Sequence, residues 1–345
     1  MNVMGISNQT IDWLLEPSDP GARYLALRDV IGLPANDADL AEARQIAHRD
    51  GPIARVLQNM NPEGWWEKPG PGYGPKYRST VWAVILLSQL GASVHEDTRV
   101  QTAATYMLEH ALTQYGQFTY SGAPGGTFGC LQGNLCNALL KMGVQDERLE
   151  RAFDWMARSV TGEGVAPLTE KKEPQRYNAY LCGPGFLCGA NYKQACAWGA
   201  VKIMLAFGNL PAAGRTEAVN SAIRQGLDFL LSVDPATAAY PTPADQKPNQ
   251  SWWKFGFPVF YITDVLQLAE SILACLPGYE PRLDPLLDLI RSKQDESGCW
   301  KMEYDYTGKT WGNYGSKGQP NKWVTLRAMR VLDLAEKLQS AVHMH

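Results

Sequence analysis

A run of apolar residues with the length of a helix recurs six times along the chain, and this repeat constrains the fold more than any other feature. Successive runs start 57, 51, 63, 67 and 62 residues apart. Each run is apolar all round, which is typical of a helix that is buried on every side. The six runs start near Ala22, Ser79, Cys130, Lys193, Phe260 and Lys322.

Amphipathic segments lie between the apolar runs. One of them places Leu149, Phe153 and Met156 on a single helical face, the pattern of a helix that covers a core from outside. No segment shows the alternating pattern of a strand. Buried helices that alternate with covering helices predict an all-α fold in two concentric rings, an α/α toroid (α6-α6 barrel) with six inner and about six outer helices. A solenoid of stacked helical hairpins has a similar period and is the alternative.

The predicted toroid makes the chain a single domain over residues 1–345. Residues 1–19 would form an N-terminal extension, and residues 339–345 would form a flexible tail. Long loops rich in glycine, proline and aromatic residues would gather at one end of the inner helices. We expect a ligand pocket at that end.

Charge and hydrophobicity narrow the classes of function. The net charge of −3, from 32 Lys and Arg against 35 Asp and Glu, gives no basic surface for nucleic acid. The N-terminus lacks the pattern of a secretory signal, and the most apolar stretch, residues 81–90, is too short to span a bilayer. We therefore expect a cytoplasmic protein without integral membrane association, with its seven cysteines mostly reduced. The sequence carries no signal of oligomeric state.

Short motifs near the apolar runs carry a family resemblance. Residues 294–300, Gln-Asp-Glu-Ser-Gly-Cys-Trp, resemble the Q-x-x-x-G-x-W repeat of squalene and hopene cyclases, and residues 61–65 are a looser copy. Residues 77–82 and 322–327 are similar to the family's junction into an inner helix. Over residues 20–338 the chain thus resembles a bacterial prenyltransferase/squalene-oxidase-repeat protein of the terpenoid-cyclase (squalene-hopene cyclase-like) toroid superfamily.

The resemblance implies an enzyme that binds an apolar, isoprenoid-type substrate in a central aromatic cavity and cyclises or isomerises it after protonation. The chain departs from the known members in its motifs. It lacks the Asp-x-Asp-Asp acid motif of class II terpene cyclases and the zinc-binding Asp-x-Cys pair of protein prenyltransferase β-subunits. The function therefore rests on the fold that the resemblance implies, which is a limited basis for a function.

Asp264 is the candidate catalytic acid. It stands near the start of an inner helix, after the aromatic and apolar residues 257–263. Burial there would raise the pKa of its carboxyl group and favour the proton-donating form. The alternative is a carboxylate that accepts hydrogen bonds from backbone N–H groups and interacts with the helix dipole.

Aromatic and polar residues near the inner-helix starts are candidates for substrate contact. Aromatic faces stabilise a carbocation or hold a flat apolar ligand, or else they pack helix against loop. Arg78 and Lys322 would hold an anionic group, unless they pair with nearby acids such as Glu303 or Glu67. Asn134 would bond a ligand or cap a loop. The aromatic candidates are Trp82, Trp198, Trp253, Tyr261 and Trp323.

Four cysteines are predicted to converge on one part of the pocket. Cys130 and Cys196 start consecutive inner helices, and Cys182 and Cys188 lie in the loop that leads into the second of them. Four thiolates would bind zinc or, as the less favoured cofactor, an iron–sulfur cluster. Buried inert thiols and a disulfide are the alternatives. The chain carries no phosphate-binding motif, so we expect no nucleotide cofactor.

Two other functions stay open beside the terpenoid-cyclase-like enzyme. One is a zinc toroid in which the cysteine-bound metal assists chemistry. The other is a non-catalytic ligand-binding toroid with a structural metal. In every case the expected partner is a small apolar or amphipathic ligand. A deep aromatic cavity that contains Asp264 would favour isoprenoid chemistry, whereas a polar cavity would argue against it.

Overall fold

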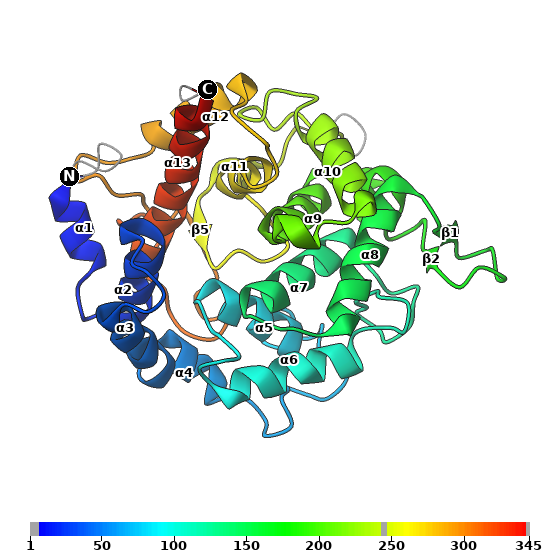
Figure 1. Cartoon of the computed structure of the whole chain (residues 1–345), viewed down its shortest axis with the longest axis horizontal. Coiled ribbons are helices and arrows are strands. Elements are labelled where there is room, and N and C mark those ends of the chain that lie inside the picture. The colour runs from blue at the N-terminus through cyan, green and yellow to red at the C-terminus, as the bar shows by residue number, and fades with distance from the viewer. Residues whose placement is uncertain (1–6, 243–246, 343–345) are drawn as a thin grey trace.

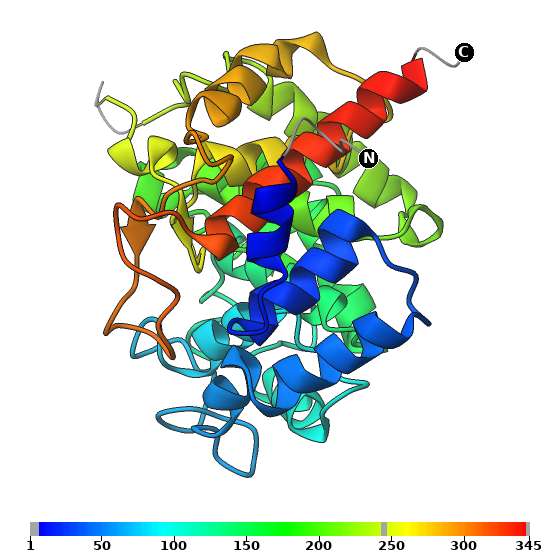
Figure 2. The same cartoon turned by 90° about the vertical axis from the view of Figure 1, so that its left-hand side faces the viewer.

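The computed structural model describes residues 7–242 and 247–342, which fold mainly into helices (Figures 1 and 2). The α-helices are α1 (Asn8–Leu14), α2 (Pro20–Ala26), α3 (Ala38–Arg49), α4 (Pro52–Leu57), α5 (Thr80–Gln89), α6 (Thr98–His110), α7 (Gly129–Lys141), α8 (Glu147–Thr161), α9 (Ala197–Asn209), α10 (Glu217–Leu230), α11 (Val265–Leu273), α12 (Asp284–Ser292) and α13 (Lys322–Val342). A π-helical segment, η2 (Leu27–Ile31), continues α2. Short 3-10 helices are η3 (Pro184–Phe186), η4 (Gly189–Asn191), η5 (Ala212–Gly214), η7 (Gln250–Trp253) and η8 (Pro281–Leu283).

The strands are two residues long and tie loops together. They are β1 (Ala166–Pro167), β2 (Arg176–Tyr177), β3 (Leu187–Cys188), β4 (Gln194–Ala195), β5 (Gly256–Phe257) and β6 (Tyr304–Asp305). β1 pairs in parallel with β2, β3 pairs antiparallel with β4, and β5 pairs in parallel with β6. The register places Cys188 opposite Gln194. The predicted all-α class is therefore confirmed at the level of helix content.

Each of the six apolar runs contains a helix, namely α2 with η2, α5, α7, α9, α11 and α13, although the runs that start near Lys193 and Phe260 begin in the loops before α9 and α11. Helix α5 shows why: every residue from Thr80 to Ser88 is buried. Helix α8 behaves as a covering helix, since Leu149 and Phe153 are buried whereas Glu150 is exposed. The two kinds of helix were thus separable by their patterns of apolar residues.

The apolar helices pack against one another in a fixed order. Helices α5, α7, α9, α11 and α13 are neighbours in that sequence, and α13 packs on α2. Helix α4 contacts both α2 and α5, so it lies between the two ends of the series. The amphipathic helices α3, α6, α8, α10 and α12 each pack on the apolar helix that precedes them in the chain (Figure 1).

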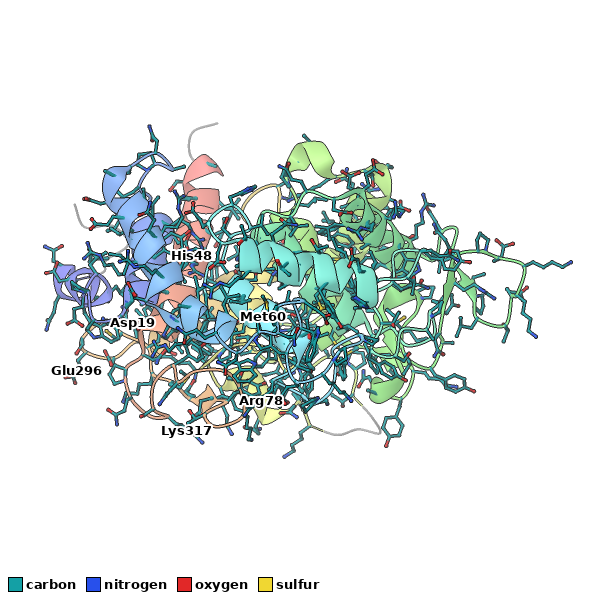
Figure 3. All side chains as sticks on the ribbon, turned by 90° about the horizontal axis from the view of Figure 1, so that it is seen from below. Asp19, His48, Met60, Arg78, Glu296 and Lys317 are labelled. Carbon is teal, nitrogen blue, oxygen red and sulfur yellow. The ribbon has the colours of Figure 1, made fainter. Side chains whose placement is uncertain are left out.

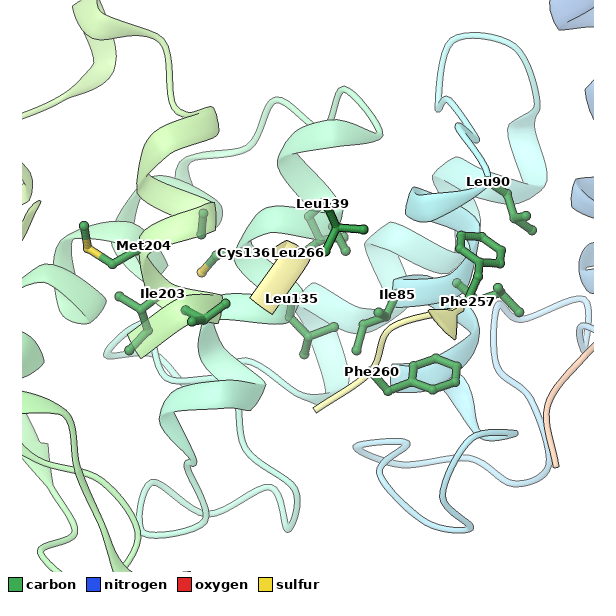
Figure 4. Close-up of a cluster of buried hydrophobic side chains, with 14 of the residues drawn as sticks. Ile85, Leu90, Leu135, Cys136, Leu139, Ile203, Met204, Phe257, Phe260 and Leu266 are labelled. Atoms are coloured by element: carbon green, nitrogen blue, oxygen red, sulfur yellow. The ribbon is translucent and has the colours of Figure 1, made fainter. Parts of the chain in front are cut away.

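Helices α7 and α9 approach each other closely. A Cβ atom on Gly133 would lie 2.4 Å from the backbone carbonyl carbon of Lys202, so a side chain at this position would force the helices apart. Leu135 and Cys136 of α7 are buried in the core beside this contact, as is Ile203 of α9 (Figure 4). This tight contact fixes α7 relative to α9, and both helices carry candidate site residues.

Both terminal segments of the described chain contain helices. Helix α1 lies within the predicted extension, and Thr10 Oγ1 donates a hydrogen bond to the carbonyl oxygen of Ser297 at 2.8 Å. Helix α13 continues to Val342, so it includes residues 339–342. Residues 343–345 lie outside the described residues. Across residues 7–242 and 247–342, no helix combines the length and the apolar character that crossing a membrane requires.

Candidate functional site

A cavity lies between helices α5, α7, α9, α11 and α13, each of which contributes to its lining. The space free of protein atoms is ≈ 550 Å³, including the part open to solvent. Leu205, Phe257 and Val259 form part of an apolar wall. Its polar lining comprises Ser88, Gln89, Asn134, Asn137, Lys141, Gln267, Glu270, Arg327 and Arg330. Polar side chains therefore form much of the cavity lining, which argues against a wholly apolar substrate.

Lys141, at the end of α7, is a cation of this cavity that has no partner. Its ammonium makes no hydrogen bond or ion pair with any residue that the structure describes. The residue is exposed, yet surrounding protein displaces water from it, and this desolvation lowers the pKa of the ammonium. Glu270 and Asp29 act to raise that pKa, whereas Arg330 and Arg28 act to lower it. Lys141 therefore lines the cavity with an ammonium that is partly shielded from water.

Glu270, on α11, is the corresponding anion. It is half-buried and lines the same cavity, and its carboxylate has no hydrogen bond or ion pair within residues 7–242 and 247–342. Glu270 acts through space to raise the pKa of Lys141, although the two side chains form no ion pair. An ammonium and a carboxylate left unpaired in one cavity can each bind the opposite charge of a ligand.

The two arginines of the cavity are already paired. Arg330 Nε lies 2.8 Å from Asp29 Oδ2. Arg327 donates hydrogen bonds from two nitrogens to the two carboxylate oxygens of Asp264, at 2.8 and 2.7 Å. Arg327 Nη1 also donates to the carbonyl oxygen of Gly256 at 2.7 Å. The fold itself uses both guanidinium groups, which distinguishes them from Lys141.

Asp264 stands directly before α11, as the sequence predicted, but its carboxylate is fully engaged. The residue is 3% exposed, and besides Arg327 its Oδ1 accepts a hydrogen bond from the backbone N–H of Gln267 at 2.8 Å. It is the N-cap of the helix. These contacts match the structural alternative for Asp264, and its role as a catalytic acid stays a prediction.

The aromatic candidates at the inner-helix starts pack against other rings. The ring centroid of Trp82 lies 5.4 Å from that of Tyr77 and 6.1 Å from that of Tyr261. Trp323 stacks on Phe257 at 4.7 Å. Offset and tilted contacts at these distances are the ordinary packing of an aromatic cluster. These rings therefore fill space with one another, and Phe257 also borders the polar cavity.

The remaining aromatic candidates contact rings or backbone. The ring of Trp198 lies 6.4 Å from Tyr261 and 6.4 Å from Trp252. Trp253 is half-buried, and its Nε1 donates a hydrogen bond to the carbonyl oxygen of Ala236 at 2.9 Å. Neither residue lines the cavity between the helices.

The predicted basic contacts are ion pairs instead. Arg78, at the surface in Figure 3, binds Glu67 at 2.8 Å and lies over the ring of Trp311. Lys322 Nζ lies 2.9 Å from a carboxylate oxygen of Glu16. Both outcomes follow the ion-pair alternative, although for Lys322 the acid is one that the sequence did not single out.

Asn134 is the predicted substrate contact that reaches the cavity. It is buried and lines the space between the helices. Its Nδ2 donates to the carbonyl oxygen of Phe260 at 3.4 Å, so its amide is held in place while it faces the cavity.

The four cysteines predicted to converge, Cys130, Cys182, Cys188 and Cys196, line one second pocket. All four are free thiols. The Cys196 thiol donates a hydrogen bond that lowers the pKa of Cys188 to about 6, and the same contact raises the pKa of Cys196. Burial raises the pKa of Cys130 to about 11 and that of Cys182 to about 12. The pocket therefore combines one thiol that ionises readily with three that do not.

No three or more His, Cys, Asp or Glu side chains are arranged to hold a metal ion, as far as residues 7–242 and 247–342 are concerned. The zinc prediction thus gains no support. The other cysteines lie elsewhere and have hydrogen-bond partners of their own. Gln132 Nε2 donates to Cys136 Sγ at 3.6 Å, and Cys275 Sγ donates to the carbonyl oxygen of Met204 at 3.2 Å.

The polar cavity is the feature that the sequence interpretation missed, although a signal was present. Asn134, Asn137 and Lys141 are spaced by three and four residues, so they share one face of an otherwise apolar helix. Gln267 and Glu270 repeat the spacing of three on α11. A polar stripe on a helix buried all round predicts a polar interior space.

A structure search finds similarity to terpene cyclases. One neighbour is a variant of the type II terpene cyclase MstE from Scytonema, in complex with its substrate geranylgeranyl dihydroxybenzoate. The two sequences are 13% identical, and the match covers 86% of this chain and 98% of that chain with a TM-score of 0.34. Another is a protein from Actinoplanes, with 11% identity, 86% and 99% coverage and a TM-score of 0.32. TM-scores this low carry no argument about this chain. No protein-family model matches the sequence, and no curated protein matches it.

Proposed function

We propose that the chain is an α/α toroid that binds a small amphipathic zwitterion in the cavity between its inner helices. The observation that carries this proposal is the pair of unpartnered charges, Lys141 and Glu270, on the wall of one cavity. Charged groups that face a recess without a protein partner are available to a ligand, whereas paired groups such as Arg327 and Asp264 are not.

The toroid is supported by the order of helix packing. The series α5, α7, α9, α11, α13 and α2 places the six apolar runs side by side, and α4 joins its two ends. Five amphipathic helices cover the series from outside. A ring of this kind encloses the cavity that five of its inner helices line.

The chemistry of the lining defines the ligand class. An anionic group would bind at Lys141, and a cationic group would bind at Glu270. The apolar part of the ligand would lie against Leu205, Phe257 and Val259. The ligand is therefore expected to have a short apolar stem between two opposite charges.

Three probes of the same stem length test this proposal. Binding of 6-aminohexanoate, hexanoate and hexylamine to the full chain is measured by calorimetry at low salt. We expect 6-aminohexanoate to bind tightest. In the unmodified chain, the Kd of 6-aminohexanoate should be lower than that of either other probe by roughly tenfold or more. Lys141→Met should bind 6-aminohexanoate no more tightly than hexylamine. Glu270→Gln should bind it no more tightly than hexanoate.

Lys172→Met is the matched control, because Lys172 is an exposed loop lysine that does not line the cavity. It should bind all three probes like the unmodified chain. Equal affinity for the three probes, or equal loss in Lys172→Met and Lys141→Met, would contradict the proposal.

The isoprenoid substrate that the family resemblance implies remains a second proposal for the apolar part of the ligand. The mixed lining of the cavity supports an amphipathic molecule over a purely apolar one. Acid-initiated cyclisation by Asp264 would require a proton donor that is released from Arg327. Turnover of an isoprenoid alcohol that survives Lys141→Met and is lost in Asp264→Asn, with the stability of the variant nearly unchanged, would favour this second proposal.

A further inference from the structure

Cys188 and Cys196 form a pair of thiols that has no role in the proposed ligand site. The antiparallel hairpin of β3 and β4 places Cys188 opposite Gln194. The backbone N–H of Cys196 donates to the carbonyl oxygen of Phe186 at 2.9 Å, which continues the pairing one residue beyond β4. Side chains two residues apart on a strand share a face, so Cys196 lies diagonally across the hairpin from Cys188.

The two thiols are in contact. The Cys196 thiol donates a hydrogen bond to the Cys188 sulfur, and the backbone N–H groups of Asn191 and Ala190, in the turn of the hairpin, donate to it as well. These donors stabilise the negatively charged sulfur and outweigh the effect of burial, so the pKa of Cys188 is lowered to about 6. Near neutral pH Cys188 is therefore mainly a thiolate, the nucleophilic form of the side chain.

Cys188 also borders an opening. It is half-buried and lines the second pocket, to which both α7 and α9 contribute. Trp155, Val160 and Phe186 form part of the apolar wall of this pocket. The pocket has room for little more than water-sized molecules. Hydrogen peroxide, with two oxygen atoms, is of that size, whereas a bulky oxidant is not.

Cys196 is placed to react after Cys188. The hydrogen bond to Cys188, followed by burial and by the charge of the Cys188 thiolate, raises the pKa of Cys196 and keeps its thiol protonated. Oxidation of Cys188 to a neutral group would remove that charge. The Cys196 sulfur accepts a hydrogen bond from the backbone N–H of Gly199 at 3.5 Å at the start of α9, and the helix dipole there favours a thiolate.

The other two thiols of the pocket lack these features. Burial raises the pKa of Cys130 to about 11 and that of Cys182 to about 12, so both stay protonated and unreactive near neutral pH. The structure therefore singles out one nucleophile and one adjacent thiol.

We propose that Cys188 is a modification site for a small hydroperoxide and that Cys196 is the thiol that resolves the oxidised product. In the first step the Cys188 thiolate attacks one oxygen of hydrogen peroxide, a sulfur–oxygen bond forms, and the oxygen–oxygen bond breaks. Hydroxide leaves, so the sulfur loses two electrons to the peroxide and becomes a sulfenic acid.

In the second step the Cys196 sulfur gives up its proton and displaces the hydroxyl group of the sulfenic acid, which leaves as water. The product is a disulfide between Cys188 and Cys196. A disulfide joins sulfurs about 2.05 Å apart, so two thiols already in hydrogen-bond contact need only a short further approach. This site is separate from the ligand cavity, and either proposal can fail while the other stands.

The test is treatment of the full chain, first reduced and then freed of reductant, with a slight excess of hydrogen peroxide at neutral pH. We expect the number of free thiols to fall from seven to five, with one disulfide between Cys188 and Cys196. Trypsin cleaves after Lys193, so this disulfide joins two peptides that mass spectrometry identifies. Cys182 shares a peptide with Cys188, and the variant Cys182→Ser should form the same disulfide.

Two variants separate the roles of the pair. Cys196→Ser should stop at the sulfenic acid, which dimedone traps on Cys188. Cys188→Ser should form no disulfide and consume peroxide at least about tenfold more slowly, because the remaining thiols ionise less readily. Cys299→Ser is the matched control, since Cys299 does not line the pocket, and it should react like the unmodified chain.

Cumene hydroperoxide tests the class of oxidant. The ratio of the rates with hydrogen peroxide and with cumene hydroperoxide should exceed the ratio measured with free cysteine by about tenfold or more, because the pocket restricts access to the Cys188 sulfur. The same ratio in the protein and in free cysteine would overturn the assignment of a small hydroperoxide.

Three further results would overturn the proposal. They are equal peroxide consumption by Cys188→Ser and the unmodified chain, a disulfide that joins other cysteines, and seven free thiols after treatment. If the serine variants fail to fold, the thiol count and the peptide analysis of the unmodified chain still decide between these outcomes.

Discussion

Helix α11 contributes an acidic residue to each of two regions of the molecule, and only one of the two acids is bound to a basic side chain of the protein. At the helix start, Asp264 and Arg327 are buried and bind each other through two hydrogen bonds. Farther along the helix, Glu270 lines a cavity that Lys141 of α7 also lines, and neither side chain has a hydrogen-bond or ion-pair partner among the described residues. The first pair holds the fold together, and the second is available to a ligand. A conspicuous acid in the sequence is therefore a weaker guide to function than an unpaired one in the structure.

The largest expected effect is the loss of the buried pair. Asp264→Asn keeps a side chain that caps the helix but leaves the Arg327 guanidinium buried without a counter-charge. We expect the free energy of unfolding to fall by about 3–5 kcal/mol. Urea unfolding followed by far-UV circular dichroism measures it.

The double variant Asp264→Asn with Arg327→Met is the control for that loss. It removes the stranded charge, so it should recover part of the stability. A single Asp264→Asn variant as stable as the unmodified chain would mean that the ion pair is not structural.

Lys202 contrasts with Lys141, because Lys202 is a buried lysine whose ammonium has a hydrogen-bond partner in the protein. It is 1% exposed, its Nζ donates to Gln267 Oε1, and burial lowers the pKa of its ammonium to about 7. Asp264 and Glu270 act to raise this pKa, and Arg327 acts to lower it. The folded chain is thus poorly adapted to a charged Lys202.

Linkage fixes the sign of the effect. Between the ordinary value of 10.5 and about 7 the unfolded chain binds more protons at Lys202, so its contribution to stability falls as pH falls and is fully lost below about 7. Lys202→Met should therefore raise the free energy of unfolding by about 1–4 kcal/mol at acidic pH and by less near pH 10. The Gln267 oxygen keeps a hydrogen bond from Thr263 at 2.8 Å. Unfolding curves at several pH values would show a pH-independent gain if Lys202 did not titrate.

The third effect is a pH dependence of ligand binding. Because the pKa of Lys141 is lowered, its ammonium loses its proton, and with it the positive charge, at a lower pH than a lysine with the ordinary pKa of 10.5. The affinity for hexanoate should therefore fall as pH rises through the range below 10.5, by about tenfold overall. Glu270 and Asp29 oppose the shift, whereas Arg28 and Arg330 reinforce it.

Lys141→Arg is the natural control for this pH dependence, since a guanidinium stays charged throughout the range. Hexanoate affinity in that variant should be nearly independent of pH. The same slope in both proteins would place the titrating group elsewhere.

The smallest expected effect sharpens the comparison from the other side. Lys141→Met and Glu270→Gln remove groups that bind nothing in the described structure, so each should change the free energy of unfolding by no more than about 0.5 kcal/mol. The same urea titration used for Asp264→Asn measures this. A loss as large as that of Asp264→Asn would show that these two charges also serve the fold.

The sequence predicted the parts of the fold that depend on local pattern. The six apolar runs and the amphipathic segments became buried and covering helices because periodicity decides which faces need burial. The convergence of the four cysteines followed from the same reasoning, since two of them start neighbouring helices. Pairing partners such as Arg327 for Asp264 lie 63 residues apart, and no local pattern reports them.

The candidate site was harder to predict because sequence signals report residue type and not whether a group is satisfied. The residue types of Trp82, Arg78 and Lys322 suit substrate contact, but the structure gives each side chain a partner within the protein. Lys141 was overlooked because a lysine at a helix end is usually a solvated group. Its position on a polar stripe of a buried helix was the informative feature.

The most direct test of the ligand cavity is the titration of Lys141 itself. Reductive methylation with ¹³C-formaldehyde gives each lysine an NMR signal, and Lys141→Met identifies the one of interest. The account predicts that this signal titrates at lower pH than those of lysines outside the cavity, such as Lys172, and that 6-aminohexanoate raises the pKa of Lys141 by placing a carboxylate beside it. A Lys141 signal that titrates with the lysines outside the cavity and does not respond to 6-aminohexanoate would contradict the account.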